Sequence, residues 1–392
     1  MAVSMPSPCK AIRHFRFPSF SNSVIPHSRK SALSVRLLYF NPENDLALAA
    51  NDPHYTPPAS ALQMATDLQL LPLRWAEEGD WILMRDPPPT PPVREGSACG
   101  RWISSQCASP SPLPDGRGRG WVCLPWGWSP LTITDFLRAG VPASLLPTDD
   151  EIQAFRTLAG RATSADVLCR VRERLKDLGY GDSLTGEAHV CHTLDEARSW
   201  HETFHESMFK QPWSGSGRGL LPAHDGVLTN KNEAWILRTL RQQGYVMAEP
   251  LYNRRIDFAL EFWRHADGRV TYEGLSLFMT TTGGVYAGNI VATEDRKRQL
   301  LANMLPLALL DDTRDALIAE LSALPPTFYV GPLGVDLMLV APHPSFVTRH
   351  SSIINHHSSF LLHPCVEINF RMTMGWLALH ISPFMEEKSQ FC

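Results

Sequence analysis

The sequence predicts a two-domain protein of mixed α/β and α+β class, with an N-terminal open α/β domain over 35–180 and an α+β domain over 187–380. Three observations support this. The chain has 392 residues, more than a single hydrophobic core usually supports. Strand, helix and strand patterns follow one another over 35–84, as at the start of an open α/β domain. From 187 onwards, strand-like and helix-like segments alternate.

Composition and charge exclude several classes of protein. The formal net charge of −4 lacks the basic surplus that is typical of nucleic-acid-binding proteins. No apolar run reaches the roughly 18 residues that a membrane span needs. The eight cysteines include no CxxC pair, which indicates reduced thiols rather than a zinc site or a disulfide framework. We therefore expect a cytoplasmic protein with neither nucleic acid nor a membrane as partner; the sequence leaves its oligomeric state open.

In the first domain, residues 35–40, 71–75 and 81–84 are predicted strands, and 59–70 has the apolar spacing of a helix. The polar loop 41–45 follows the first strand. It would lie at the carboxyl end of that strand, where open α/β sheets bind ligands. Turn chemistry explains its Asn, Pro and Asp residues equally well, and we favour that interpretation slightly.

Further elements are predicted by end signals and periodicity. Thr148 and Glu151 form a capping box that starts a helix, and Gly244 ends another. The predicted helices of this part of the chain cover 164–178, 194–205, 230–243, 292–304 and 312–323. The predicted strands cover 188–191, 207–211, 245–249, 256–263, 270–279, 334–340 and 365–371.

Three segments lack the pattern of a folded core. Residues 1–34 contain no acidic residue and resemble an organellar transit peptide, but an unstructured extension fits equally well and is preferred because no amphipathic helix is visible. Residues 86–120, rich in Pro, Gly and Ser, are predicted to be a disordered insertion. Residues 341–363 are rich in Ser and His. Their histidines could bind a metal, but the biased composition favours a disordered insertion.

A lysine stands before a loop of small residues. Lys210 ends an apolar strand, and the loop 214–219, with the sequence SGSGRG, follows it. Successive backbone N–H groups in such a loop form an anion-binding concavity, and the lysine adds a point charge for phosphate. On this stretch alone, a hairpin loop that happens to contain a lysine is an equal alternative.

Acidic residues stand at the end of one of the following predicted strands and within two others. Glu249 ends a strand before Pro250, and the extended connection after it exposes backbone groups that can bind an adenine edge. Asp257 could receive ribose hydroxyls, and it shares a strand face with Glu261. Asp336 interrupts an apolar strand, so we expect a cation or hydrogen-bond donors around it.

The segment 365–371 carries the strongest pattern. A period of two places Glu367, Asn369 and Arg371 on one face of the strand. Two oxygen ligands and a cation on one face suit Mg²⁺ that bridges phosphates, with the arginine on an anionic group. The alternative is an edge strand with a solvated polar face.

Taken in order, these motifs resemble the ATP-grasp superfamily over roughly residues 187–376. The resemblance implies two α+β lobes that hold ATP between antiparallel sheets, with ATP and Mg²⁺ as cofactors. It also implies a carboxylate–amine ligase: a small-molecule acid is activated as an acyl phosphate, which an amine or thiol attacks. The alternatives are a non-catalytic or inactivated nucleotide-binding protein and a small-molecule kinase that uses the same ATP site.

The resemblance implies a role for each motif residue. Lys210 and Arg371 would be catalytic, with Lys210 on the ATP phosphates and Arg371 near the transferred phosphate or the acid. Asp336, Glu367 and Asn369 would face the metal. The other cofactor-binding residues would be Ser214, Gly215, Ser216, Gly217 and Gly219 over the phosphates, Glu249 and Leu251 at the adenine, and Asp257 at the ribose.

The sequence departs from the family pattern in several places. No convincing match exists for the further phosphate-binding lysine that such proteins commonly carry upstream, and Lys176 is only a candidate. Asp257 stands where glutamate is more usual. The insertions at 86–120 and 341–363 raise the alternative of an inactive copy.

Overall fold

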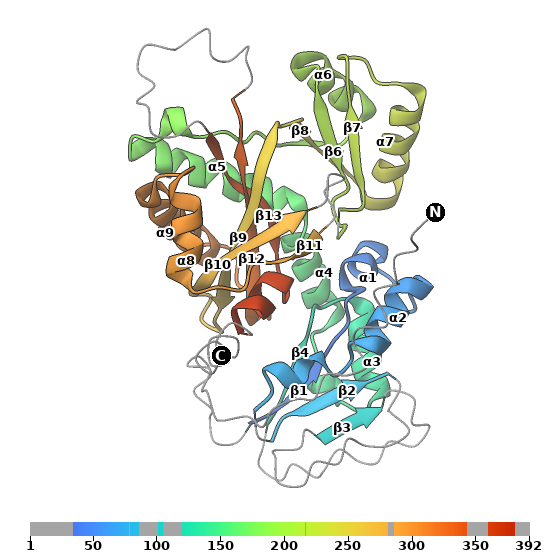
Figure 1. Cartoon of the computed structure of the whole chain (residues 1–392). Helices are drawn as coiled ribbons and strands as arrows, with labels where there is room; N and C mark the ends of the chain where they lie inside the picture. The colour runs from blue at the N-terminus through green and yellow to red at the C-terminus, as the bar shows by residue number, and fades with distance from the viewer. Residues whose placement is uncertain are drawn as a thin grey trace, which may run out of the picture.

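The computed structural model describes residues 34–77, 79–85, 101–104, 120–215, 217–280, 286–342 and 360–380. These residues form one parallel and two antiparallel sheets (Figure 1). The predicted mixed α/β and α+β class is therefore confirmed. No helix of the described part of the chain is long and apolar enough to cross a membrane. The cysteines of these residues, Cys123, Cys169, Cys191 and Cys365, are free.

The parallel sheet has the strand order β3-β2-β1-β4. Its strands are β1 (Ser34–Tyr39), β2 (Trp81–Met84), β3 (Arg101–Ser104) and β4 (Gly120–Pro125), with helices α1 (Asn44–Ala50), α2 (Ala59–Asp67) and α3 (Pro130–Arg138). The chain continues from β1 to β2 on one side, whereas β4 pairs with the other side of β1. The strand order therefore reverses between β1 and β4, the position where open α/β sheets bind ligands.

Two expectations for this region were wrong. Residues 71–74 form a 3-10 helix instead of a strand, because Pro72 fixes its own backbone and has no N–H to give to a sheet ladder. Arg101–Ser104 pairs with β2 inside the stretch 86–120 that was predicted to be disordered throughout. The rest of that stretch outside β4, and residues 1–33, lie outside the described residues.

The small antiparallel sheet has the order β5-β8-β6-β7. It consists of β5 (His189–Cys191), β6 (Ser207–Lys210), β7 (Leu220–Ala223) and β8 (Val246–Pro250), with helices α6 (Leu194–Phe204) and α7 (Asn230–Gln243). Phe209, Ile236 and Val246 form its buried core with residues of α6. Gly244, at φ 88°, ends α7 in the left-handed conformation that the sequence analysis expected.

The large antiparallel sheet has the order β11-β10-β9-β12-β13. Its strands are β9 (Arg254–Arg264), β10 (Val270–Thr280), β11 (Tyr286–Asn289), β12 (Gly331–Val340) and β13 (Leu361–Asn369). Because β13 begins at Leu361, the last three residues of the expected insertion 341–363 belong to a strand, and 343–359 lie outside the described residues.

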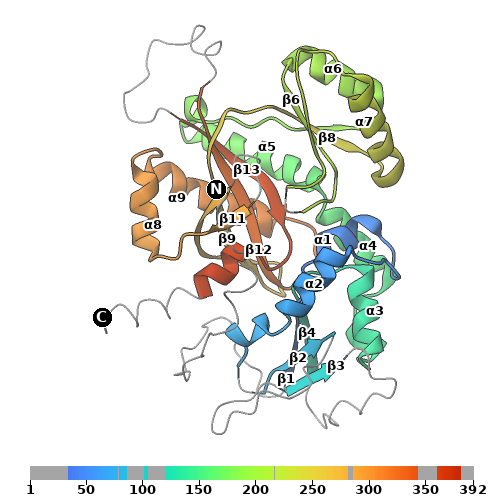
Figure 2. The same cartoon turned by 45° about the vertical axis from the view of Figure 1, so that its right-hand side comes forward.

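Helices cover one face of the large sheet. Helices α8 (Glu294–Ala302) and α9 (Leu307–Ser322) contact β10, and α5 (Arg161–Asp177) contacts both β13 and α9 (Figure 2). Phe258, Leu260 and Phe262 of β9 belong to the same buried core as residues of these helices. The opposite face carries the polar side chains of β9, and part of it packs against the helical residues 374–380 through Trp263 and Trp376.

The first domain is joined to the large sheet by aromatic packing. Trp75 lies 5.8 Å, between ring centroids, from Trp376 of the helical residues 374–380. In α4 (Asp149–Leu158), Phe155 stacks on Tyr329 at 5.2 Å between ring centroids, and its edge meets Phe370, which directly follows β13. Through these contacts, the carboxyl end of the parallel sheet packs against the end of β13.

We expect Phe155→Ala to lower the free energy of unfolding by about 3–5 kcal/mol, because the buried ring leaves a cavity between α4 and the large sheet. Urea-induced unfolding measures the change. Leu137→Ala, at a side chain that is 45% exposed, is the control and should change stability by less than about 0.5 kcal/mol. Equal effects of the two substitutions would contradict this packing.

Candidate functional site

Three neighbouring strands of the large sheet place the expected polar residues on one face. Asp336 lies directly opposite Glu367, and Met338, two residues along β12, lies opposite Asp257. Residues opposite each other in an antiparallel pair, and residues two apart on a strand, share a face. Asp257, Asp336, Glu367 and Asn369 therefore lie together, and we call this surface the polar face.

Glu261 also belongs to the polar face. It lies opposite Gly334, which in turn lies opposite Asn369. Its carboxylate is buried and accepts a hydrogen bond of 2.8 Å from the Thr373 hydroxyl. Gly334 gives it room, since a Cβ there would stand 2.8 Å from its Oε2.

On the small sheet, Lys210 and Glu249 form a buried ion pair, with 2.6 Å between Nζ and Oε2. The positive charge of Lys210 also affects Asp257 on the large sheet. Burial raises the pKa of Asp257, and the Lys210 charge partly offsets that increase. In this conformation the charge of Lys210 is matched by Glu249 instead of a ligand.

The glycine-rich loop packs against the first domain. Gly215 approaches Asp45 so closely that a Cβ on it would stand 2.1 Å from the Asp45 Oδ2. Gly217 and Gly219 adopt positive φ values of 71° and 67°, which explains glycine at both positions. Ser216 lies outside the described residues.

Arg161, at the first position of α5, binds the loop to the polar face, and the sequence analysis missed it. Its Nη2 donates to both carboxylate oxygens of Glu367 at 2.8 Å, and its Nη1 donates to Ser214 Oγ at 2.7 Å. The resemblance implies a further phosphate-binding lysine, but its candidate, Lys176, lies exposed near the end of α5. No local sequence pattern distinguishes a functional arginine at the start of a helix from an arginine on the solvent-exposed surface.

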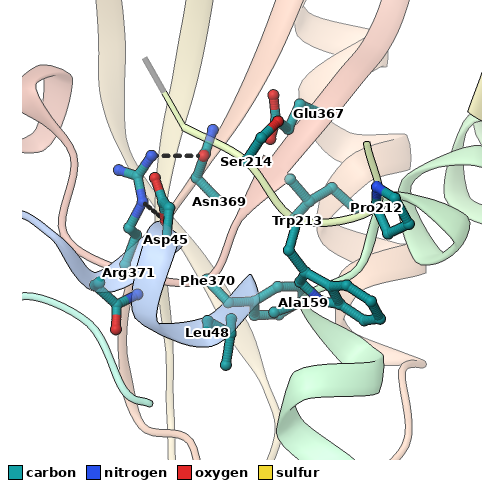
Figure 3. Close-up of a pocket in the computed structure, with 12 residues that line it drawn as sticks. Asp45, Leu48, Ala159, Pro212, Trp213, Ser214, Glu367, Asn369, Phe370 and Arg371 are labelled. Atoms are coloured by element: carbon teal, nitrogen blue, oxygen red, sulfur yellow. Dashed lines mark hydrogen bonds and ion pairs between the residues drawn. The ribbon is translucent and has the colours of Figure 1, made fainter. Parts of the chain in front are cut away.

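Arg371 connects the polar face to the first domain. Its Nε donates to Asp45 Oδ1 at 2.8 Å, and its Nη2 donates to Asn369 Oδ1 at 3.0 Å (Figure 3). Asn369 in turn donates through Nδ2 to Asp336 at 3.3 Å. The donors that were expected around Asp336 are therefore partly provided by Asn369.

These groups border a pocket of about 30 Å³, room for about two water molecules. Its lining joins three parts of the chain: Asn44 and Asp45 of α1, Trp213 and Ser214 of the loop, and Glu367 and Arg371 at the end of β13 (Figure 3).

The adenine contacts implied by the resemblance are only partly available here. Glu249 is paired with Lys210, and the backbone N–H of Leu251 donates to the carbonyl of Glu206 at 2.9 Å. His363, opposite Met338, is buried with no hydrogen bond at either ring nitrogen. The neighbouring histidines of the expected insertion, His350, His356 and His357, lie outside the described residues.

The carboxylate and amide oxygens of the polar face suit a magnesium ion that is also coordinated by phosphate oxygens. Among the described residues, no group of three or more His, Cys, Asp and Glu side chains is arranged to hold a metal by itself. Mg²⁺ is usually held by one or two carboxylates together with phosphate oxygens and water, so a complete protein cage is not required. Asp336 and Glu367 face each other, and burial together with the Glu367 charge raises the pKa of Asp336 to about 7. A cation between them would relieve that repulsion.

Burial also raises the pKa of Glu261 to about 8. The folded protein therefore keeps this proton at a pH where the unfolded chain has released it, so the contribution of Glu261 to stability falls as pH rises from about 4.5 to about 8. We expect Glu261→Gln to lose less stability than wild type between pH 5 and pH 9, as measured by urea unfolding. Parallel profiles would contradict this, and Glu202→Gln, at an exposed side chain, is the control.

No family model and no curated protein matches the chain. Solved structures similar to it include N5-carboxyaminoimidazole synthetase from Staphylococcus aureus with ADP, at 13% identity and a TM-score of 0.42, over 89% of this chain and 76% of that one. Carboxyaminoimidazole ribonucleotide synthase from Aspergillus clavatus with ATP has 14% identity and a TM-score of 0.43, over 87% and 71%. D-alanyl-alanine synthetase A from Vibrio cholerae has 10% identity and a TM-score of 0.42, over 91% and 93%.

Identities and TM-scores this low carry over neither substrates nor site residues to this chain.

Proposed function

We propose that this protein is an ATP- and Mg²⁺-dependent ligase-like enzyme that activates a carboxylate as an acyl phosphate for attack by an amine or thiol. The observation that carries the proposal is the convergence of oxygen ligands and cations at one place. Asp336, Glu367 and Asn369 share the polar face, and a glycine-rich loop is bound to that face through a buried arginine.

The cations suit phosphoryl transfer, which depends on charge stabilisation more than on covalent chemistry of the protein. Lys210, Arg161 and Arg371 all lie at the site, each paired with a carboxylate: Glu249, Glu367 and Asp45, respectively. Mg²⁺, when bound, would take oxygen ligands from Asp336, Glu367 and Asn369 and neutralise phosphate oxygens. Arg161 can then direct its planar donors at phosphate, a geometry that guanidinium groups favour.

Arg371 is well suited to bind the carboxylate of the acid substrate. It lies where α1 meets the end of β13, and a guanidinium binds a carboxylate or a transferred phosphate through two parallel hydrogen bonds. Its present partner, Asp45, comes from the first domain. Both domains would therefore contribute to the place where the acid is activated.

A second candidate, a nucleotide-binding protein without turnover, is favoured by a specific observation. Each of the three cations already has an internal carboxylate partner, and the pocket has a volume of only about 30 Å³. ADP release separates the candidates: release that needs an amine or thiol favours the ligase, and release with a phosphorylated alcohol favours a kinase. ATP binding without release favours the non-catalytic protein.

We expect calorimetric titration of ATP with Mg²⁺ to show saturable binding, weakened about 10- to 100-fold by Lys210→Ala and by Glu367→Ala, because each removes a charged contact. Lys231→Ala, at an exposed lysine of α7, is the matched control and should bind as wild type does. Thermal unfolding of each variant checks that it is folded, since Lys210→Ala leaves Glu249 buried without its partner. Absence of binding by folded wild-type protein would refute the proposal.

A further inference from the structure

The loops after β1 and β4 meet at the point where the strand order of the parallel sheet reverses. Asn41 Nδ2 donates to the carbonyl of Gly127 at 2.8 Å, and the Gly127 N–H donates to Asn41 Oδ1 at 3.2 Å. Asn44 lies against the same glycine: a Cβ on Gly127 would stand 2.2 Å from the Asn44 Nδ2. Because residue 127 is a glycine, the Asn44 side chain has room to lie at this point where the strand order reverses.

Two neighbouring side chains here hold buried oxygens without partners. Asn44 is 2% exposed, and its Oδ1 accepts no hydrogen bond. Glu43 is also 2% exposed; one of its oxygens pairs with Arg85, and its Oε2 accepts none. Buried polar groups are nearly always hydrogen-bonded in folded proteins, so two such oxygens in adjacent residues indicate that donors arrive with a ligand.

One of these two residues, Asn44, borders the proposed reaction site directly, and Glu43 precedes it in the chain. Asn44 lines the same pocket as Glu367, Asn369 and Arg371. A ligand group that donates to Asn44 would therefore lie beside the groups that we propose for metal, phosphate and acid. That is where the nucleophile of a ligase has to be held, because it attacks the activated carbon directly.

The missing partners define the chemistry of the ligand. The unpartnered Oε2 of Glu43 is an acceptor when the carboxylate is ionised, so a ligand that donates would satisfy it. The carboxylates of Glu43, Asp45 and Asp135 are already paired with the guanidinium groups of Arg85, Arg371 and Arg138, so the ligand need not bring a charge. A neutral amino group supplies two strong donors and keeps the lone pair that attacks. A thiol is a weak single donor.

We propose that Asn44 and Glu43 bind the amino group of an amine co-substrate at the junction between the first domain and the polar face. The inference rests on the proposed ligase function and goes beyond it by selecting an amine over a thiol. Glu43 ends the connection between β1 and α1, and Asn44 is the first residue of α1. Both lie outside the ATP-related motifs, and they determine which nucleophile is accepted.

The test measures thermal unfolding of the full chain with Mg²⁺ and ADP, since a ligand that binds only the folded state raises its unfolding temperature. The probes are the twenty amino acids, ethanolamine and putrescine, with thioglycolate, 2-mercaptoethanol and butanedithiol as thiol counterparts of glycine, ethanolamine and putrescine. We expect at least one amine to raise the unfolding temperature. If that amine has a thiol counterpart in the set, the counterpart should not.

The variants are Asn44→Leu and Glu43→Gln, which should weaken binding of that amine at least tenfold, with Asn303→Leu at an exposed position as matched control. Asn44→Asp keeps the shape and adds acceptor charge, so it should retain amine binding. It thus separates lost recognition from misfolding. The response to Mg²⁺ and ADP, recorded on the same samples, tests the proposed function independently.

Three results would overturn the inference: equal stabilisation by a thiol counterpart, an amine effect that survives both Asn44→Leu and Glu43→Gln, or no effect of any amine on protein that responds to Mg²⁺ and ADP. An amine effect that depends on Asn44, in protein with no nucleotide response, would support the amine site while refuting the ligase.

Discussion

The organisation of the site depends on one buried guanidinium. Arg161 donates to Glu367 on β13 and to Ser214 in the glycine-rich loop, and its backbone N–H donates to the Pro212 carbonyl at 3.2 Å. Its side chain therefore joins α5, the loop and the polar face. A buried ion pair of this kind contributes little net stability over an apolar contact, but removing one partner is costly. Its main consequence here is to fix where the loop lies.

Charge pairing explains why so many ionisable groups can share this small volume. Lys210 with Glu249, Arg161 with Glu367 and Arg371 with Asp45 are three cation–carboxylate pairs from different elements. Asp336 is the carboxylate of the polar face with an amide as its hydrogen-bond donor, and burial beside Glu367 raises its pKa. Asp336 is thus the carboxylate whose ionised form a metal ion would stabilise.

The helix α1, which follows the first strand of the parallel sheet, contributes to the lining of the pocket. Trp75 packs on Trp376, and the backbone N–H of Met372 donates to the carbonyl of Trp126 at 2.8 Å. These contacts hold α1 against the end of β13, so Asp45 reaches Arg371 and Asn44 reaches the pocket. The polar loop 41–45, for which ligand binding and turn chemistry were both open to the sequence analysis, consequently borders the site.

The sequence by itself determined the features that local physics controls. Strand periodicity placed Glu367 and Asn369 on one face of β13, but the strand ends at Asn369, so Arg371 lies beyond the predicted periodicity. The capping box at Thr148 and the glycine at 244 marked helix ends where the structure has them. Two predictions from local propensity were wrong. Residues 71–75 were predicted to be a strand, and β3 was not predicted because its surroundings are polar and its stability comes from pairing with β2.

Only the tertiary structure decided which charges meet. Arg161 and Glu367 are 206 residues apart in the chain, and Arg371 and Asp45 are 326 apart. No pattern within a segment encodes such a contact, because it depends on strand register and on how helices pack across the sheet. The same holds for Asn44 and Glu43: their residue types are visible in the sequence, but their burial without hydrogen-bond donors follows from the meeting of two loops at the strand-order reversal.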